Sequence, residues 1–280
     1  MSDDTFSRIK HALDERFGAT VALAPGQPGA EMLARFLEHR SHRKFADRAV
    51  AADLLRLICA CALSAPSKSD LQQADIIEVR DTGKRKTIAD LIPDMPWVRA
   101  APVFLVFCAN SRRIRQVGEL RGKPFANDHL DAFMNAAVDA GIVLEAFIIA
   151  AAAAGLGCCP ISAVRNHAKT VSDLLRLPDW VFPVAGLCVG YPAEEGRITP
   201  RLPLEVTVHV DCFDESGLAA KIDGYDRRRA AKQQYAKQRS PERYGTAAFY
   251  GWSEDKARQY SHPERADFGA FIRGKRFKLD

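Results

Sequence analysis

"HLDAFMNAAVDAGIVLEAFIIAAAAAGLG", residues 129–157, decides the fold of this 280-residue chain. Apolar side chains cover so much of each turn that the stretch predicts one long helix, buried on nearly all sides. Glu145 inside it and the breaks at Gly155, Gly157 and Pro160 favour a core or interface helix over a membrane span. One small domain cannot cover such a helix alone, so the stretch also predicts a homodimer.

Shorter strands and helices are predicted on both sides of this helix. Apolar runs between turn residues predict strands at 74–81, 101–110, 181–192 and 205–211, and a turn or short strand at 158–164. Helical periodicity predicts helices at 31–38, 54–61, 83–92 and 169–177. No regular βαβ repeat, GxGxxG turn or GxxxxGK[ST] loop is present. The order therefore predicts an α+β fold, a central sheet flanked by helices.

Composition and charge indicate a globular, cytoplasmic protein. The chain is 47% hydrophobic and 27% charged, its net charge is +5, and its N-terminus lacks the apolar segment of a signal peptide. Its seven cysteines show no zinc spacing, so we expect reduced thiols and no metal. Basic residues dominate positions 227–243. Three uses of this run stay open: a nucleic-acid contact, a solvated helix face, or a rim that attracts an anionic small molecule.

Two short basic segments are candidate anion sites. "RSHRKF", residues 40–45, places three cations and a hydroxyl just after a predicted helix. Arginine pairs with phosphate through two parallel hydrogen bonds, but an exposed turn could carry the same residues for solubility. "RITPRLP", residues 197–203, is stiffened by two prolines, which lowers the entropy lost when Arg201 is fixed on a ligand.

Four segments in order resemble the nitroreductase-like FMN-dependent oxidoreductase superfamily. They are "HRSHRKF" (39–45), "SAPSKSDLQ" (64–72), "AAAAAGLGCCPISAVRN" (150–166) and "GLCVGYPAEEGRITPRLP" (186–203). The basic C-terminal segment is similar to that of the NADPH-preferring flavin reductase and nitroreductase branch. The resemblance implies a central, mostly antiparallel sheet and an intertwined homodimer. It also implies three segments: an N-terminal helical extension (1–30), an FMN-binding domain (31–215) and a basic C-terminal extension that packs on the dimer (216–280).

The resemblance also assigns ligand-binding residues. His39, Ser41 and Arg201 gather the FMN phosphate, Arg40 lies in the same segment, and Arg43 lies near flavin N1 and O2. In the loop that meets the flavin edge, Ser67 is favoured over Gln72. The remaining contacts are Pro160 and Ile161 beside the ring, the Ser162 backbone N–H at N5, and Arg239 and Arg243 at the 2′-phosphate of NADPH.

The implied activity is an FMN-dependent NAD(P)H oxidoreductase. NADPH or NADH passes a hydride to the flavin, and a nitroaromatic, a quinone or free flavin then takes two electrons at the same place, a ping-pong sequence. This chemistry needs no side-chain acid or base, so no catalytic residue is predicted, and neither a nucleic acid nor a membrane is an expected partner. Two alternatives stay open: a flavin- or nucleic-acid-binding protein without turnover, and a reductive dehalogenase-type enzyme that uses the same cofactor.

Overall fold

The computed structural model describes residues 3–24 and 27–280, and the chain divides into two compact units. The first unit combines residues 1–40 with residues 197–264, and the second combines residues 41–196 with residues 265–280. The predicted N-terminal extension and most of the basic C-terminal segment thus belong to one unit.

The second unit is built on a four-stranded sheet. Its strands are β1 (Ala74–Glu78), β2 (Val103–Asn110), β3 (Gly157–Ile161) and β4 (Val181–Gly190), in the order β1-β2-β4-β3. Every neighbouring pair is antiparallel. All residues of β2 are buried, as expected of a central strand made of one continuous apolar run. The predicted α+β fold with a mostly antiparallel central sheet is confirmed.

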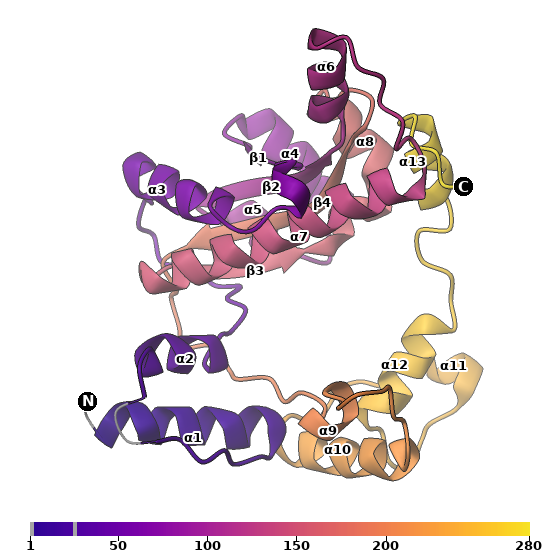
Figure 1. The fold of residues 1–280 in the computed structure, drawn as a ribbon. Coiled ribbons are helices and arrows are strands. Elements are labelled where there is room, and N and C mark those ends of the chain that lie inside the picture. Colours follow the sequence, from indigo (N-terminus) through magenta and orange to yellow (C-terminus); the bar gives the residue numbers. More distant parts are fainter. Residues whose placement is uncertain (1–2, 25–26) are drawn as a thin grey trace. The chain divides into compact units, whose positions relative to one another are not determined.

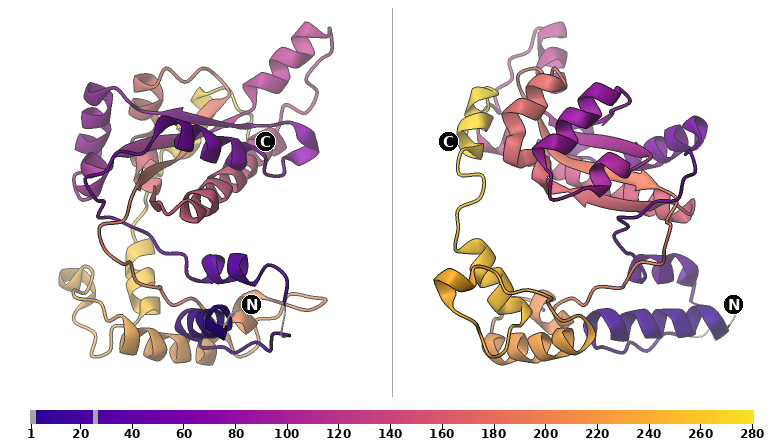
Figure 2. Two further views of the ribbon diagram at one scale, coloured as in Figure 1. Left: turned by 90° about the vertical axis from the view of Figure 1, so that its left-hand side faces the viewer. Right: turned by 180° about the vertical axis from the view of Figure 1, so that it is seen from behind.

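Helices cover both faces of this sheet (Figures 1 and 2). On one face α3 (Ala52–Leu63), α7 (Leu130–Ala153) and α13 (Phe268–Gly274) share a core with alternate residues of β2. The other face packs against α4 (Thr82–Leu91), α5 (Trp97–Ala100) and α8 (Ala168–Leu174). The strands therefore bury both sets of side chains.

The long helix α7 is a core helix. It has the length and mean hydropathy to cross a membrane. It instead buries Ala136, Phe147 and Ala151 completely against the sheet, where the Phe147 ring meets Phe107 edge-on at 5.6 Å. A second set of apolar side chains on α7 remains exposed, at Leu130, Met134, Val138 and Ile142.

Two features of the fold differ from the sequence predictions. The helix α6 (Arg112–Leu120) was not predicted, because its four charged residues leave no continuous apolar stripe. The predicted strand at 205–211 is wrong. The helix α9 (Leu204–Thr207) occupies its first part, and Val208 and Val210 are exposed without a strand partner.

The first unit is helical. Its other helices are α1 (Asp3–Phe17), α2 (Ala30–Leu37), α10 (Leu218–Lys232), α11 (Pro241–Tyr244) and α12 (Trp252–Tyr260). The helices α1 and α2 lie side by side (Figure 1). Arg8 of α1 links them through ion pairs with Glu31 at 2.8 Å and Glu38 at 2.7 Å. Gly18 ends α1 at φ 64°, and its missing side chain leaves room for Arg228 of α10.

Candidate functional site

The segment 41–46 lies along the ends of two strands in the second unit. Ser41 forms a parallel bridge with Cys158 of β3, and the N–H of His42 donates to the Cys158 carbonyl at 2.9 Å. The imidazole of His42 packs so closely on Gly157 that a Cβ there would lie 2.7 Å from its ring. Two motifs that are far apart in the sequence are therefore joined by backbone contacts.

Arg43 lies in a small group of side chains next to β3. Its guanidinium lies 5.4 Å from the centre of the Trp97 ring, close enough for a cation–π contact. Burial raises the pKa of the Cys159 thiol, and the nearby positive charge of Arg43 opposes the rise. The high pKa keeps Cys159 protonated and unreactive, and Arg43 stays exposed with a fixed neighbour.

The end of β3 alternates between exposed and buried residues. Pro160 and Ser162 are exposed, whereas Ile161 between them is 1% exposed and packs in the core against Val164 and its neighbours. A ligand at this edge can therefore meet the ring of Pro160 and the backbone at Ser162. Because the Ile161 side chain is buried, its predicted contact with a flavin can involve only its backbone.

Ser67 lies on a loop that the buried carboxylate of Asp139 holds. The Ser67 hydroxyl donates to Asp139 Oδ2 at 2.7 Å and accepts the Gln72 backbone N–H at 2.7 Å. Asp139, which is 1% exposed on α7, also accepts the backbone N–H groups of Lys68 at 3.0 Å and Gln73 at 3.3 Å. The predicted role of Ser67 therefore depends on Asp139, which fixes the loop.

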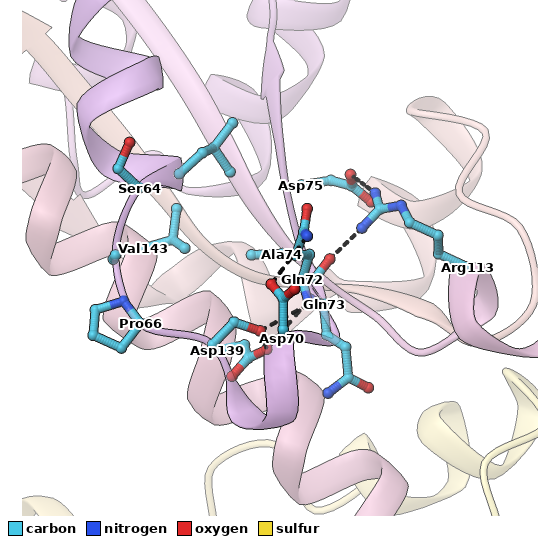
Figure 3. A pocket seen from close by; sticks show the side chains of 13 residues that line it. Ser64, Pro66, Asp70, Gln72, Gln73, Ala74, Asp75, Arg113, Asp139 and Val143 are labelled. Atoms are coloured by element: carbon cyan, nitrogen blue, oxygen red, sulfur yellow. Dashed lines mark hydrogen bonds and ion pairs between the residues drawn. The ribbon is translucent and has the colours of Figure 1, made fainter. Parts of the chain in front are cut away.

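A cavity of about 520 Å³ opens beside this loop (Figure 3). Asp139 and Ser67 line it together with Arg113 of α6. Arg113 crosses the rim, donating to the Gln72 carbonyl and to the Asp75 carboxylate. The cavity thus has a polar wall of paired groups and an apolar wall that includes Val143.

In the first unit, Arg16 gathers the other predicted phosphate residues. Its buried guanidinium donates to the carbonyl of His39 at 2.5 Å and to that of Thr199 at 3.5 Å, and its own carbonyl accepts the backbone N–H of Arg201 at 2.6 Å. Burial lowers the pKa of Arg16, and the nearby positive charges of Arg201 and Arg40 lower it further. His39, Arg40 and Arg201 therefore lie around one buried cation, in a cluster that suits an anion.

Arg239 and Arg243 lie in the C-terminal part of the first unit with different partners. Arg239 donates to Asp255 Oδ1 at 3.0 Å, and Asp255 is 2% exposed. Burial would raise the pKa of Asp255, but hydrogen bonds from Lys256 and Tyr250 and the charges of Lys256 and Arg239 lower it overall. Arg243 is exposed beside the His262 ring at 3.2 Å. Arg243 is the freer of the two predicted 2′-phosphate ligands.

Two residues of these sites, Arg16 and Asp139, were not predicted from the sequence, and for Trp97 the sequence left open whether it covers the pocket or simply packs. Asp139 had a usable signal, because an acid inside an otherwise apolar helix must find hydrogen-bond donors. Trp97 follows Pro96 in a predicted loop, where nothing marks it as a neighbour of Arg43. Arg16 had no signal, since its partners lie up to 183 residues away in the chain.

The residues present fit a flavin mononucleotide by their chemistry. The cluster around Arg16 offers cations to a dianionic phosphate, and within the described residues Arg16 has no carboxylate partner. The edge of β3 offers an exposed proline face, a backbone end and the cation of Arg43, which match a flat ring with acceptor atoms.

Two family models match the chain. The model described as "Nitroreductase family" matches residues 37–191, and the model described as "Nitroreductase family, C-terminal domain" matches residues 199–280. Residues 1–36, which include α1 and most of α2, lie outside both matches.

Curated relatives and solved structures agree with these matches. A Bacillus subtilis protein named FMN reductase (NAD(P)H) is 38% identical over 70% of this chain and 80% of its own length. Vibrio harveyi NADPH-flavin oxidoreductase is 30% identical over 85% of this chain and 95% of its own. The structure of B. megaterium NfrA2 superposes with a TM-score of 0.80 at 34% identity, covering 89% of this chain and 98% of its own. The structure of the NADPH:FMN oxidoreductase from V. harveyi complexed with NAD+ superposes with a TM-score of 0.76 at 28% identity, covering 87% of this chain and 97% of its own.

Proposed function

The chain belongs to the nitroreductase family, and we propose from this premise that it is an FMN-dependent NAD(P)H oxidoreductase that reduces nitroaromatics, quinones or free flavin. The observation that carries the proposal is the family match over residues 37–191 and 199–280, which covers three of the four resembling segments in full and the fourth except for residues 192–198. Relatives named FMN reductase, NADPH-flavin oxidoreductase and oxygen-insensitive NADPH nitroreductase support the same reaction class.

FMN is the proposed cofactor, and its phosphate is assigned to the residues that the sequence resemblance gives for it. His39, Arg40 and Arg201 would hold the phosphate together with the Ser41 hydroxyl, which follows Arg40 directly in the chain. Charge-assisted hydrogen bonds from arginine to phosphate are about twice as strong as neutral ones, so these contacts would dominate cofactor affinity. The support for this assignment is the gathering of His39, Arg40 and Arg201 around Arg16.

The flavin ring is assigned to the edge of β3. Pro160 and the Ile161 backbone would lie against the ring, and the exposed Ser162 would offer its backbone N–H. When bound, FMN supplies the two-electron redox chemistry, and the residues of this chain orient it and adjust its charge. Arg43, held on Trp97, presents a cation that stabilises negative charge on the reduced cofactor. Ser67 is assigned to the same cofactor through the loop that Asp139 fixes.

A homodimer is part of the proposal. Exposed apolar side chains follow one another at four-residue spacing on α7, at Leu130, Met134, Val138 and Ile142. This spacing places them on one face of the helix, opposite the face that packs on the sheet. An exposed apolar stripe of this length on a core helix is typical of a subunit interface. We assign it to a second copy of this chain, in agreement with the interface predicted from the sequence.

NADPH, or alternatively NADH, is the proposed electron donor. Arg243 and Arg239 are assigned to the 2′-phosphate of NADPH, and the exposure of Arg243 beside His262 supports this role. The cytoplasm, where both nucleotides occur, is the proposed location. All seven cysteines are free thiols, as is usual in a reducing compartment.

A reductive titration tests the proposed function. Purified protein is expected to be yellow, to bleach anaerobically with one equivalent of NADPH per flavin, and to regain its colour with one equivalent of a quinone. Initial rates at several fixed quinone concentrations should give parallel double-reciprocal lines, as expected of a ping-pong sequence. A protein that binds flavin but does not bleach would show that binding occurs without turnover.

A further inference from the structure

The N-terminal helix α1 carries a buried arginine, Arg16, whose guanidinium forms hydrogen bonds to the backbone of two distant segments. The Arg16 side chain is 6% exposed, and its guanidinium donates to the carbonyl of Leu37 at 2.9 Å and to that of His39 at 2.5 Å. A third, longer contact reaches the carbonyl of Thr199 at 3.5 Å. The planar guanidinium of Arg16 thus links the backbone just before Arg40 to the backbone just before Arg201.

The helix α10 also contacts this junction, the place where Arg16 meets the backbone before Arg40 and Arg201. The Arg16 carbonyl accepts the backbone N–H of Arg201 at 2.6 Å and the guanidinium of Arg228 at 3.3 Å. Arg228 also donates to the Arg201 carbonyl at 2.6 Å. The backbone on both sides of the Arg201 side chain is therefore fixed by two arginines.

Three arginines of this junction have no carboxylate partner among the described residues. In the described part of the chain, Arg16, Arg201 and Arg228 form hydrogen bonds to carbonyl groups and no ion pair with a carboxylate. A buried cation is costly unless its charge is balanced. The like charges of Arg201 and Arg40 add to this cost for Arg16, as its lowered pKa reflects. An anion bound at this point would relieve it.

We propose that Arg16 is a positioning residue for the phosphate of the cofactor: its guanidinium fixes the segments that present His39–Arg40 and Arg201, and its charge stabilises the bound anion. The inference rests on the proposed function. It gives the N-terminal extension a role in cofactor binding, although residues 1–36 lie outside the matched family ranges. Arg16 fixes these segments in advance, so the entropy of ordering them is not lost when the phosphate binds.

The test compares two ligands that differ only in the phosphate. Apoprotein is titrated with FMN and with riboflavin, and flavin fluorescence quenching gives both dissociation constants. Loss of a hydrogen-bonded buried charge is expected to weaken FMN binding by Arg16→Met about tenfold to hundredfold, since such bonds contribute about 1.5–3 kcal/mol. Riboflavin binding is expected to change less than about threefold, because its contacts lie away from the phosphate.

Two further variants separate positioning from general stability. Arg8→Met removes an arginine of the same helix whose partners are Glu31 and Glu38, and it should leave the ratio of FMN to riboflavin affinity unchanged. Arg16→Lys keeps the charge but loses the fork, and it should fold and show an intermediate ratio. The inference is overturned if Arg16→Lys binds FMN as the parent does, or if FMN and riboflavin weaken equally. A parent protein that binds neither ligand would instead refute the proposed function.

Discussion

Replacing Asp139 by alanine should destabilise the second unit and release the loop that carries Ser67. The carboxylate accepts three hydrogen bonds, from the Ser67 hydroxyl and from the backbone N–H groups of Lys68 and Gln73. Water can replace it at Ser67 and Lys68, which lie on a surface loop. Gln73 is 2% exposed, so its N–H would lose its partner without gaining water.

The size of the effect follows from these contacts. A hydrogen bond to a charged group contributes about 1.5–3 kcal/mol, and an unpaired buried donor costs about 1–3 kcal/mol. Because water compensates two of the three bonds, we expect Asp139→Ala to lower the free energy of unfolding by about 2–4 kcal/mol. For a chain of this size that is a fall in Tm of roughly 5–15 °C.

Urea unfolding followed by circular dichroism measures this loss, and limited proteolysis reports on the loop. The matched control is Asp131→Ala on the same helix, because Asp131 is exposed and accepts one side-chain hydrogen bond, from Asn135 at 2.7 Å. That control should lose less than about 1 kcal/mol. The reasoning is refuted if Asp139→Ala is no less stable than Asp131→Ala, or if cleavage within residues 64–73 does not accelerate.

Four further variants test other parts of the account. Arg201→Met should raise the Kd for FMN about tenfold to hundredfold in calorimetry and leave that for riboflavin nearly unchanged; equal losses would exclude a phosphate contact. Met134→Asp should convert the proposed homodimer to a monomer in sedimentation velocity, because it places a charge in the apolar stripe of α7; an intact dimer would place the interface elsewhere. Arg243→Ala should raise the KM for NADPH and spare that for NADH, and a parallel rise in both would remove Arg243 from the 2′-phosphate. Asp255→Asn should lower Tm at pH 7 and lose this effect below about pH 3.8, because a lowered pKa stabilises the fold only while the carboxylate is ionised; a constant difference in Tm would contradict the ion-pair argument.

The central sheet and the long helix were predictable from local sequence. The run that forms β2 is apolar at nearly every position, which is typical of a strand buried on both faces. The α7 sequence combines length, helix-forming alanines and a wide apolar surface, so its burial follows from the hydrophobic effect alone. Both predictions needed only neighbours within one turn or one strand.

The failed strand at 205–211 shows what local patterns leave out. Val206, Val208 and Val210 alternate as strand residues do, yet a strand forms only where a partner edge is available. This segment belongs to the helical first unit, while the described sheet lies in the second. Whether a neighbouring strand is available depends on the whole fold, and the alternation of valines along one segment does not indicate it.

The candidate site was predicted in part for a similar reason. Ser41 and Cys158 become neighbours through a bridge between segments more than a hundred positions apart, and the motif resemblance suggested their proximity. The contacts of Arg16 and Asp139 depend on side-chain packing over comparable separations, and no motif marked them. Residues that fix the backbone around a site are harder to predict than residues that contact the ligand. They form hydrogen bonds to backbone atoms, which every residue has, so the sequence does not mark their partners.

Diffraction from crystals of the protein grown with FMN would test the central claim most directly. We expect the phosphate within hydrogen-bond distance, about 3 Å, of the Arg201 guanidinium and of the segment 39–41, with Arg43 beside the ring. A phosphate bound away from Arg201, or a ring that does not lie at residues 160–162, would contradict it.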